Sequence, residues 1–550
     1  MLLNLFILFK VRLLLNKLSF LIIVLSLLLS TPVVAQYQWS VPLTSIISNE
    51  TKEPPQAFLR IPENCKHVRA VLIGQHNMTE ETIFENPKFR KEMGKLDIAI
   101  VWVSPGFNML FDFNNGAGEQ FESIMNALAT ASGYTELQFV PAIPIGHSAY
   151  ATYPWNFAAW NPARTLAVLS IHGDAPLTNL TGFGRPNMQW GNRNIDGVPG
   201  LMVEGEYEWL ETRVQPALDF QQRFPAATVS FLCDAGHGHF DISNELIDYL
   251  ILFIKKAVQY RLPSATALDK PVLLKPLDPR KGWLKERWKK DLKPTYSAAL
   301  YNQYKGEKKE AFWYFDQEMA HATEKFYAKV RGKKEQYLGF SQNGALLPFN
   351  PKQHARIFGK FSPEADGLTF HVQALFTDTL RTKSIGNHAK ANPTITRICG
   401  PVEKINDTTF TVRFYRMGLD NEKRTGDIWL MASHPGDKNY KSSVQQFNVR
   451  IPLQNKDGID QHIRFPAIQN IKQGINSISL KASSDSGMPV YFYVQEGPAE
   501  WKDGKLIFTK IPPRSKFPIK ITVVAWQYGR SIEPKIKSAT PVGQTFYILK

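Results

Sequence analysis

The chain has 550 residues, of which 43% are hydrophobic and 21% charged, and its formal net charge is +16. This composition is that of a folded protein and excludes a largely disordered chain, while the length indicates several domains. Three cysteines are too few for a disulfide-rich scaffold. Positive charge attracts anionic partners, but no nucleic-acid-binding motif accompanies the dispersed basic residues, so we expect no nucleic-acid partner.

Residues 1–35 have the pattern of a secretory signal peptide. Three basic residues precede the apolar stretch LSFLIIVLSLLL, and the small residues of a cleavage site follow and end at Ala35. The short apolar core and the interior charges favour cleavage over a permanent membrane anchor, the alternative. We therefore expect cleavage after Ala35 and a periplasmic or secreted protein that meets the membrane only through this segment.

From residue 66 to residue 262, apolar runs alternate with helical patterns, which is typical of a parallel sheet with crossover helices. Six runs have the character of buried strands: VRAVLIG (68–74), DIAIVWVSP (97–105), LQFVPAIPIG (137–146), TLAVLSIHG (165–173), VPGLMVEG (198–205) and ATVSFLCDAG (227–236). This pattern predicts an α/β domain over residues 36–263 with a mostly parallel sheet covered by helices on both faces.

The composition and the hydrophobic pattern of the sequence change after this domain. Residues 264–337 are rich in charge and aromatic side chains and predict a helical linker region, with EAFWYFDQEMAHATEKFYAKV as its clearest helix. Short alternating strands then predict a β-sandwich over 338–455 and an immunoglobulin-like β-sandwich over 456–550.

Ser148 stands in the segment FVPAIPIGHSAYATYPW, where an apolar strand leads into a helix. A serine in a tight turn at this place exposes its hydroxyl at the carboxyl edge of the sheet, as a catalytic nucleophile requires. Gly146 fits the small residue that such a turn needs before the serine, whereas Tyr150 stands where the common pattern has glycine. A serine that only caps a helix is the alternative.

An acid and a histidine follow in the chain order that a catalytic triad of this kind uses. Glu208 follows the strand that ends at Gly205, with Glu206 and Asp174 as alternative acids. The segment CDAGHGHFDIS offers two histidines before the last helix, of which we favour His237 over His239.

These motifs resemble the α/β-hydrolase superfamily over residues 60–262. The segments GQHNMTEETIF, GHSAYATYPW, GEYE and GHGHFDIS also resemble secreted bacterial carbohydrate esterases of polysaccharide-utilisation systems. The resemblance implies a Ser148 nucleophile, a histidine base, an acid that orients the histidine, and an acyl-enzyme intermediate. It implies no metal and no cofactor.

The oxyanion formed in such a reaction requires two backbone N–H donors. Ala149, directly after the serine, is expected to supply one of them. The second donor is expected from the loop after the first core strand, at Gln75, His76 or Asn77.

The segment DAPLTNLTGFGRPNMQWGNRNIDG suggests a substrate site, because aromatic and amide side chains are suited to sugars. We expect Asn187, Trp190 and Arg193 to bind substrate. The sequence thus predicts a secreted serine esterase that removes methyl, acetyl or feruloyl groups from a plant polysaccharide such as pectin. One alternative is an inactive hydrolase-like protein that binds carbohydrate or serves as a scaffold. The other is a lipase or peptidase on the same fold.

Overall fold

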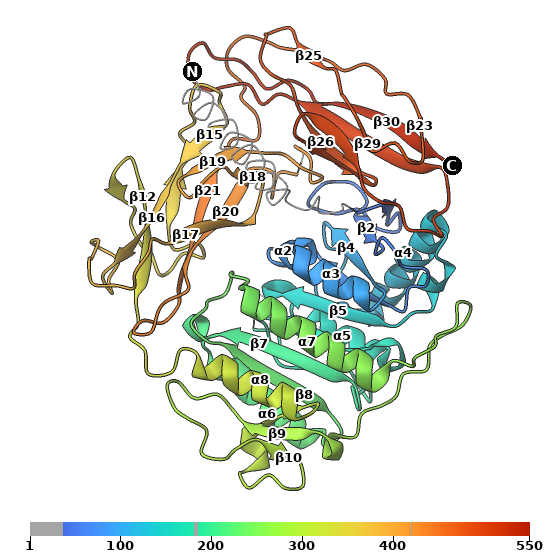
Figure 1. Cartoon of the computed structure of the whole chain (residues 1–550), viewed down its shortest axis with the longest axis vertical. Helices are drawn as coiled ribbons and strands as arrows, with labels where there is room; N and C mark the ends of the chain where they lie inside the picture. Colours follow the sequence, from blue (N-terminus) through green and yellow to red (C-terminus); the bar gives the residue numbers. More distant parts are fainter. Residues whose placement is uncertain (1–36, 181–184, 420) are drawn as a thin grey trace, which may run out of the picture. The chain divides into compact units, whose positions relative to one another are not determined.

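The computed structural model describes residues 37–180, 185–419 and 421–550 (Figure 1). The expected signal peptide lies outside the described residues, so it stays a prediction. Among the residues that the structure describes, no helix combines the length and the apolar character needed to cross a membrane.

An eight-stranded sheet organises the first half of the chain, with the strand order β1-β2-β4-β3-β5-β6-β7-β8. From β3 to β8 all neighbours are parallel, whereas β2 is antiparallel to both β1 and β4. The strands are β1 Trp39–Pro42, β2 Gln56–Arg60, β3 Ala70–Gln75, β4 Ile98–Ser104, β5 Ala142–His147, β6 Val168–Ile171, β7 Pro199–Gly205 and β8 Thr228–Asp234. This topology confirms the predicted mostly parallel sheet.

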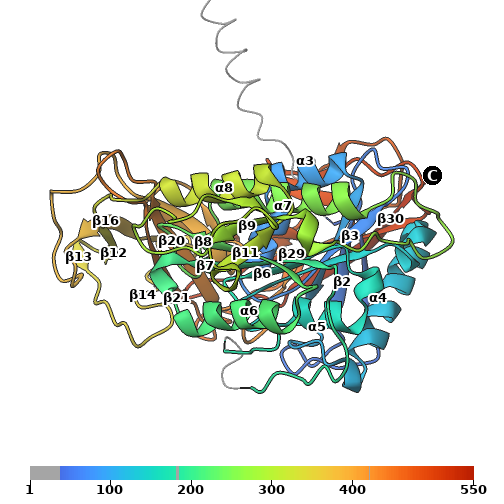
Figure 2. The same cartoon turned by 90° about the horizontal axis from the view of Figure 1, so that it is seen from below.

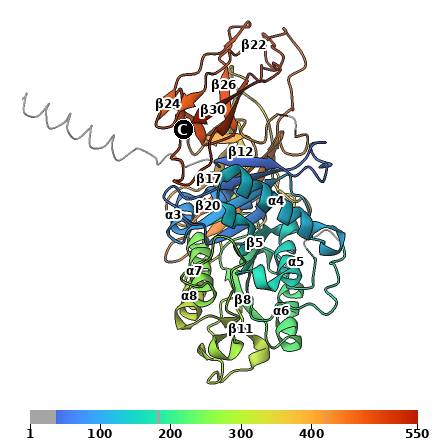
Figure 3. The same ribbon diagram turned by 90° about the vertical axis from the view of Figure 1, so that its right-hand side faces the viewer.

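Helices cover both faces of this sheet. Figures 2 and 3 place α3, α7 and α8 on one face and α4, α5 and α6 on the other. The helices are α2 Glu80–Glu85, α3 Pro87–Lys95, α4 Ala117–Ser132, α5 Tyr153–Trp160, α6 Glu211–Arg223, α7 Asn244–Arg261 and α8 Gln317–Ala328. Because helices cover both faces of the sheet, strands β3 to β8 are buried along their whole length and are mostly apolar.

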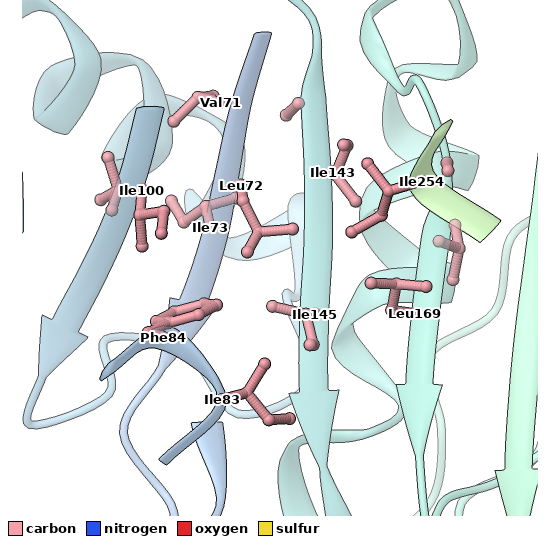
Figure 4. Close-up of a cluster of buried hydrophobic side chains, with 14 of the residues drawn as sticks. Val71, Leu72, Ile73, Ile83, Phe84, Ile100, Ile143, Ile145, Leu169 and Ile254 are labelled. Carbon is pink, nitrogen blue, oxygen red and sulfur yellow. The ribbon is translucent and has the colours of Figure 1, made fainter. Parts of the chain in front are cut away.

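Figure 4 shows part of the core that results. Leu72 and Ile73 of β3 lie between Ile100 of β4 and Ile145 of β5, and all four side chains are buried. Ile254 of α7 closes the cluster from one face. Burial of each such side chain contributes roughly 1.5–3 kcal/mol, so this core fixes the strand ends that carry the site.

Residues 264–337 contain helix α8, as expected, but also an antiparallel sheet of order β10-β9-β11 that the sequence analysis did not predict. Its strands are β9 Trp283–Glu286, β10 Ala299–Leu300 and β11 Ala311–Tyr314. The sequence pattern predicts that the residues EAFWYF belong to the helix, and the structure corrects this. The Asp316 side chain accepts a hydrogen bond from Met319 N and caps α8, so the helix begins after these residues and leaves them to β11.

From residue 337 on, the regular structure of the described chain is all-β, as predicted. In residues 337–450 the strands are β12 Tyr337–Gln342, β13 Ala345–Leu346, β14 Phe358–Lys360, β15 Thr369–His371, β16 Gln373–Thr377, β17 Thr394–Cys399, β18 Val402–Lys404, β19 Thr409–Val412, β20 Asp427–His434 and β21 Ser443–Arg450. In residues 463–549 they are β22 Ile463–Arg464, β23 Ile471–Lys472, β24 Ser477–Ile478, β25 Ser483–Ser484, β26 Tyr491–Glu496, β27 Ala499–Lys502, β28 Lys505–Phe508, β29 Ile519–Trp526 and β30 Val542–Leu549.

Hydrophobic contacts link these β regions to each other and to the α/β region. Phe465 and Phe492 belong to the same core as the eight-stranded sheet, and Trp526 and Tyr528 belong to the core of the first β region. Residues Gln36–Lys550 accordingly form one compact unit. The domain boundaries at 263, 337 and 455 stay predictions.

Candidate active site

Ser148 lies in a sharp turn between β5 and the short 3-10 helix Ser148–Tyr150 that precedes α5. The backbone φ angle of Ser148 is 53°, in the left-handed region that residues other than glycine rarely adopt. A Cβ on Gly146 would lie 2.0 Å from the Tyr150 carbonyl oxygen, so the turn requires glycine at this position. The strained backbone holds the serine hydroxyl at the carboxyl edge of the sheet.

Tyr150 occupies the position where the common pattern has a second glycine. Its ring lies against Gly106, in the loop after β4, where an added Cβ would meet the Tyr150 hydroxyl at 2.3 Å. A glycine in a neighbouring loop thus makes room for the ring, and the turn keeps its shape.

His239 connects the serine to an acid. Its Nε2 lies 2.7 Å from Ser148 Oγ, and its Nδ1 hydrogen-bonds the Glu208 carboxylate. In the tautomer that this arrangement favours, Nδ1–H donates to Glu208 and Nε2 accepts from the serine hydroxyl. The three residues follow β5, β7 and β8, and parallel strands bring these ends to one edge of the sheet.

The structure does not bring His237, the histidine favoured by the sequence analysis, to the serine. His237 Nδ1 hydrogen-bonds Asp241, which also accepts from Gly238 N at 2.9 Å and so turns the loop. Burial lowers the pKa of His237, but the carboxylates of Asp234 and Asp241 outweigh it and raise the pKa to about 9. An imidazolium has no lone pair for a serine proton, whereas His239, the alternative, has the required geometry.

Glu208 is the acid that the structure places beside His239. The same carboxylate hydrogen-bonds His172 Nδ1 and accepts from Gly205 N at 3.1 Å, and Arg213 Nη1 lies 3.6 Å away. Burial raises the pKa of Glu208, but His239 and His172 outweigh it and hold the pKa well below its ordinary value. Glu208 therefore stays ionised and orients His239.

The alternative acids have other partners. Glu206 pairs with Lys441 Nζ at 2.7 Å and accepts from Gly236 N, while Asp174 lies 3.5 Å from Arg213 Nε. His172 was not predicted, although its place at the end of the strand TLAVLSIHG was a signal that could have pointed to it.

Two backbone N–H groups remain for an oxyanion. Ala149 lies in the first turn of the short 3-10 helix that begins at Ser148, where N–H groups lack partners within the helix. His76 N donates to Val103 O at 2.8 Å, which removes it as a donor. No described residue accepts a hydrogen bond from Asn77 N, and the Asn77 side chain donates to His147 O at 2.9 Å. The loop thus offers Asn77, but not His76, to the site.

Arg424, from the first β region, fixes the peptide between His76 and Asn77. Its Nη2 donates to His76 O at 3.1 Å and its Nη1 to Asn77 O at 2.6 Å. Since the C=O and N–H of a trans peptide point in opposite directions, the bond to His76 O directs the Asn77 N–H away from Arg424. Glu50 holds the guanidinium from its other side.

A cleft of about 380 Å³ opens above the serine. One wall comes from the α/β region and carries the site, and the other comes from the loop before β14 and from Gln446 of β21. Its lining residues are Ser148, Leu180, Glu208, Arg213, His239, Phe240, Pro351, Lys352, Gln353, His354, Arg356 and Gln446.

The residues expected to bind substrate do not line this cleft. Trp190 is 3% exposed and donates to Asn156 Oδ1, so its ring offers no open face to a sugar. Asn187 accepts a hydrogen bond from the same Asn156, and the Arg193 guanidinium lies over the Phe113 ring. These three side chains thus have partners elsewhere in the α/β region, and of the described part of their segment only Leu180 lines the cleft.

Two groups of described residues have donor atoms close enough to hold a metal ion. One is His172, Glu208 and His239, which overlaps the serine site, and the other is Asp234, His237 and Asp241. Serine-based ester hydrolysis uses neither group as metal ligands.

Comparisons with known proteins found no matching family model and no matching curated protein. Solved structures with similar folds include a phospholipase/carboxylesterase from Dyadobacter fermentans, with 15% identity over 36% of this chain and 95% of that chain and a TM-score of 0.26. An S-formylglutathione hydrolase from Staphylococcus aureus has 11% identity, 41% and 96% coverage and a TM-score of 0.29. A truncated carbohydrate esterase from gut microbiota has 10% identity, 41% and 98% coverage and a TM-score of 0.28.

The strand order, the strained serine turn and the chain order of serine, acid and histidine after β5, β7 and β8 define the class of the domain. The chain has an α/β-hydrolase fold.

Proposed function

We propose that the protein is a serine esterase in which Ser148 is the nucleophile, His239 the general base and Glu208 the acid. The single observation that carries the proposal is the hydrogen-bonded series from Ser148 through His239 to Glu208 at the floor of an open cleft. Nucleophile, base and orienting acid within hydrogen-bond reach are the signature of covalent acyl transfer.

The reaction proceeds in two halves. His239 Nε2 takes the proton of Ser148 Oγ as the oxygen attacks the ester carbonyl carbon, and the tetrahedral intermediate expels the alcohol, which takes that proton from His239. Water then attacks the acyl-enzyme with the same histidine as base, releasing the acid and restoring the serine hydroxyl. Glu208 stabilises the imidazolium that forms in each half.

The N–H groups of Ala149 and Asn77 serve as the oxyanion donors in this scheme. Each would contribute on the order of 3 kcal/mol to the transition state, because the donors are already fixed when the charge develops.

We further propose that the substrate is an ester decoration, such as a methyl, acetyl or feruloyl group, on a plant polysaccharide such as pectin. The lining of the cleft supports this choice over a lipid, since only Leu180, Phe240 and Pro351 among its described lining residues are apolar. A lipid acyl chain would require a more continuous apolar wall.

The proposal is tested with p-nitrophenyl acetate and a panel of esterified polysaccharides assayed for released methanol, acetate and ferulate. We expect Ser148→Ala to fold normally but to lose hydrolysis and fluorophosphonate labelling. Ser297→Ala, at an exposed serine outside the site, is the matched control and keeps both. A wild-type protein that binds glycan but neither hydrolyses esters nor labels would support the inactive scaffold instead.

A further inference from the structure

The wall of the cleft that faces the catalytic residues is basic. It consists mainly of the segment 351–356, which contributes Lys352 and Arg356. We propose that these two side chains form a subsite for a carboxylate of the substrate, placed next to the ester that Ser148 attacks. This inference rests on the proposed esterase function and names the class of ester: one whose glycan or acyl part carries a carboxylate.

The charges of the cleft are unbalanced. Of the described residues that line it, only Glu208 is acidic, and His239, His172 and Arg213 already surround that carboxylate. Among the described residues, neither Lys352 nor Arg356 has a carboxylate within ion-pair distance, and Glu208, the acidic group that attracts Arg356, is already held by these three partners. Uncompensated positive charge in a concave site concentrates anions there.

A second cleft of about 390 Å³ provides an internal comparison. It also lies between the α/β region and the first β region, and its cations Lys329 and Arg397 have carboxylate partners, Glu245 at 2.8 Å and Glu81 at 3.2 Å. Both of these cations are thus paired, whereas Lys352 and Arg356, which line the cleft beside Ser148, are not.

The segment that carries the subsite is held firmly. Arg356 has a φ of 64°, and its backbone accepts from Asn350 N at 2.7 Å and donates to Gln353 O at 3.1 Å. Lys352 N donates to the Asn350 side chain. A tight turn therefore presents both cations, and little backbone entropy is lost when an anion binds.

The same segment packs against the catalytic machinery. Ala355 is fully buried with Phe240 and Trp429, and the His354 ring meets the Phe240 ring at 4.9 Å. Because Phe240 follows His239 directly, the basic turn keeps a fixed position relative to the catalytic histidine. The Arg356 guanidinium suits a carboxylate, whose two oxygens match its fork of N–H donors.

The kinetic test compares Arg356→Gln and Lys352→Gln with Lys360→Gln, a control at an exposed lysine of β14 outside the cleft. The substrates are neutral p-nitrophenyl acetate, its hemisuccinate counterpart with a carboxylate on the acyl part, and partly methylated oligogalacturonate with carboxylates on the glycan. We expect kcat/KM for at least one anionic substrate to fall by about tenfold or more in Arg356→Gln, mainly through KM. Hydrolysis of the acetate should change by less than about twofold.

Which anionic substrate loses activity identifies where the carboxylate resides. Arg356→Lys should recover part of the loss, and added salt should reduce the preference of the wild type for anionic esters. Equal losses on neutral and anionic esters, or no loss on either anionic ester, would overturn the proposal.

Binding measurements separate the subsite from the esterase activity. De-esterified oligogalacturonate and free succinate, titrated calorimetrically into the full chain carrying Ser148→Ala, should bind more weakly by about tenfold when Arg356→Gln is added. If wild-type protein hydrolyses no ester but this difference is present, the esterase proposal fails and the subsite stands. If neither ligand binds, the subsite fails whatever the activity.

Discussion

His237 and His239 stand two residues apart, yet their surroundings give them different chemistry. Asp234 is fully buried and lies with Asp241 around His237, so this histidine is charged at neutral pH. His239 lies between a carboxylate and the serine hydroxyl, as a general base requires. We therefore propose that His237 stabilises the loop and that His239 is the general base.

A pH-dependent contribution to stability follows for His237. Its pKa is raised from 6.5 to about 9 in the folded protein, so its stabilising effect is fully present below about pH 6.5 and is lost as pH rises through about 9. We expect His237→Gln to lower the free energy of unfolding at pH 6 by on the order of 1 kcal/mol, and much less at pH 10.

Urea unfolding of wild type and variant at both pH values measures this difference. His67→Gln is the control, because His67 lies outside the loop. A deficit that stays constant between the two pH values would contradict a charged His237.

At this scale the sequence predicts part of the site. Ser148 and Glu208 follow from their places just after apolar strands, because parallel strand ends converge. The choice between His237 and His239 depends on how Asp241 turns the loop, a contact that the Gly-His-Gly pattern does not encode. The expected role of Trp190 in substrate binding shows a similar limit, because aromatic side chains suit a hydrophobic core as well as a sugar-binding site.

Among the elements, the turn between β5 and α5 is the most constrained by sterics. We expect Gly146→Ala to lower the free energy of unfolding by about 2 kcal/mol or more and to abolish most activity, because its Cβ would collide with the Tyr150 carbonyl oxygen. The matched control is Gly543→Ala in β30, where an added Cβ meets nothing within 4 Å.

Thermal unfolding and p-nitrophenyl acetate hydrolysis test both variants. Normal activity in Gly146→Ala would mean that the turn opens without cost and that the strained geometry is not required.

Some strands can be predicted from sequence patterns and others cannot. Strands β3 to β8 can be predicted because each lies within one of the longer, mostly apolar runs that buried parallel strands produce. Strands β9–β11 are only two to four residues long, and such runs cannot be told from parts of a helix by periodicity.

On the scale of the whole molecule, the β regions complete the site of the α/β region. They supply one wall of the cleft through residues 351–356, and Arg424 orients the peptide that carries the Asn77 N–H. These contacts join positions more than 300 residues apart in one case, and no local sequence pattern could have indicated them.

We expect Arg424→Gln to reduce kcat by about tenfold with little change in KM, because the Asn77 donor serves the transition state and not the bound ester. Lys423→Gln is the matched control, since Lys423 is exposed and lies near the same Glu50 carboxylate but contacts neither carbonyl of the loop. Steady-state kinetics on p-nitrophenyl acetate measures the effect. A rise in KM with unchanged kcat would contradict a role of Arg424 in orienting the oxyanion donor.

The central claim is that Ser148, His239 and Glu208 act as one catalytic unit. The most direct test compares kcat of the His239→Gln variant with kcat of the His237→Gln variant. With p-nitrophenyl acetate near neutral pH, we predict that His239→Gln lowers kcat by about a thousandfold or more, while His237→Gln stays within about threefold of the wild type. Loss of activity in His237→Gln with retention in His239→Gln would contradict the account.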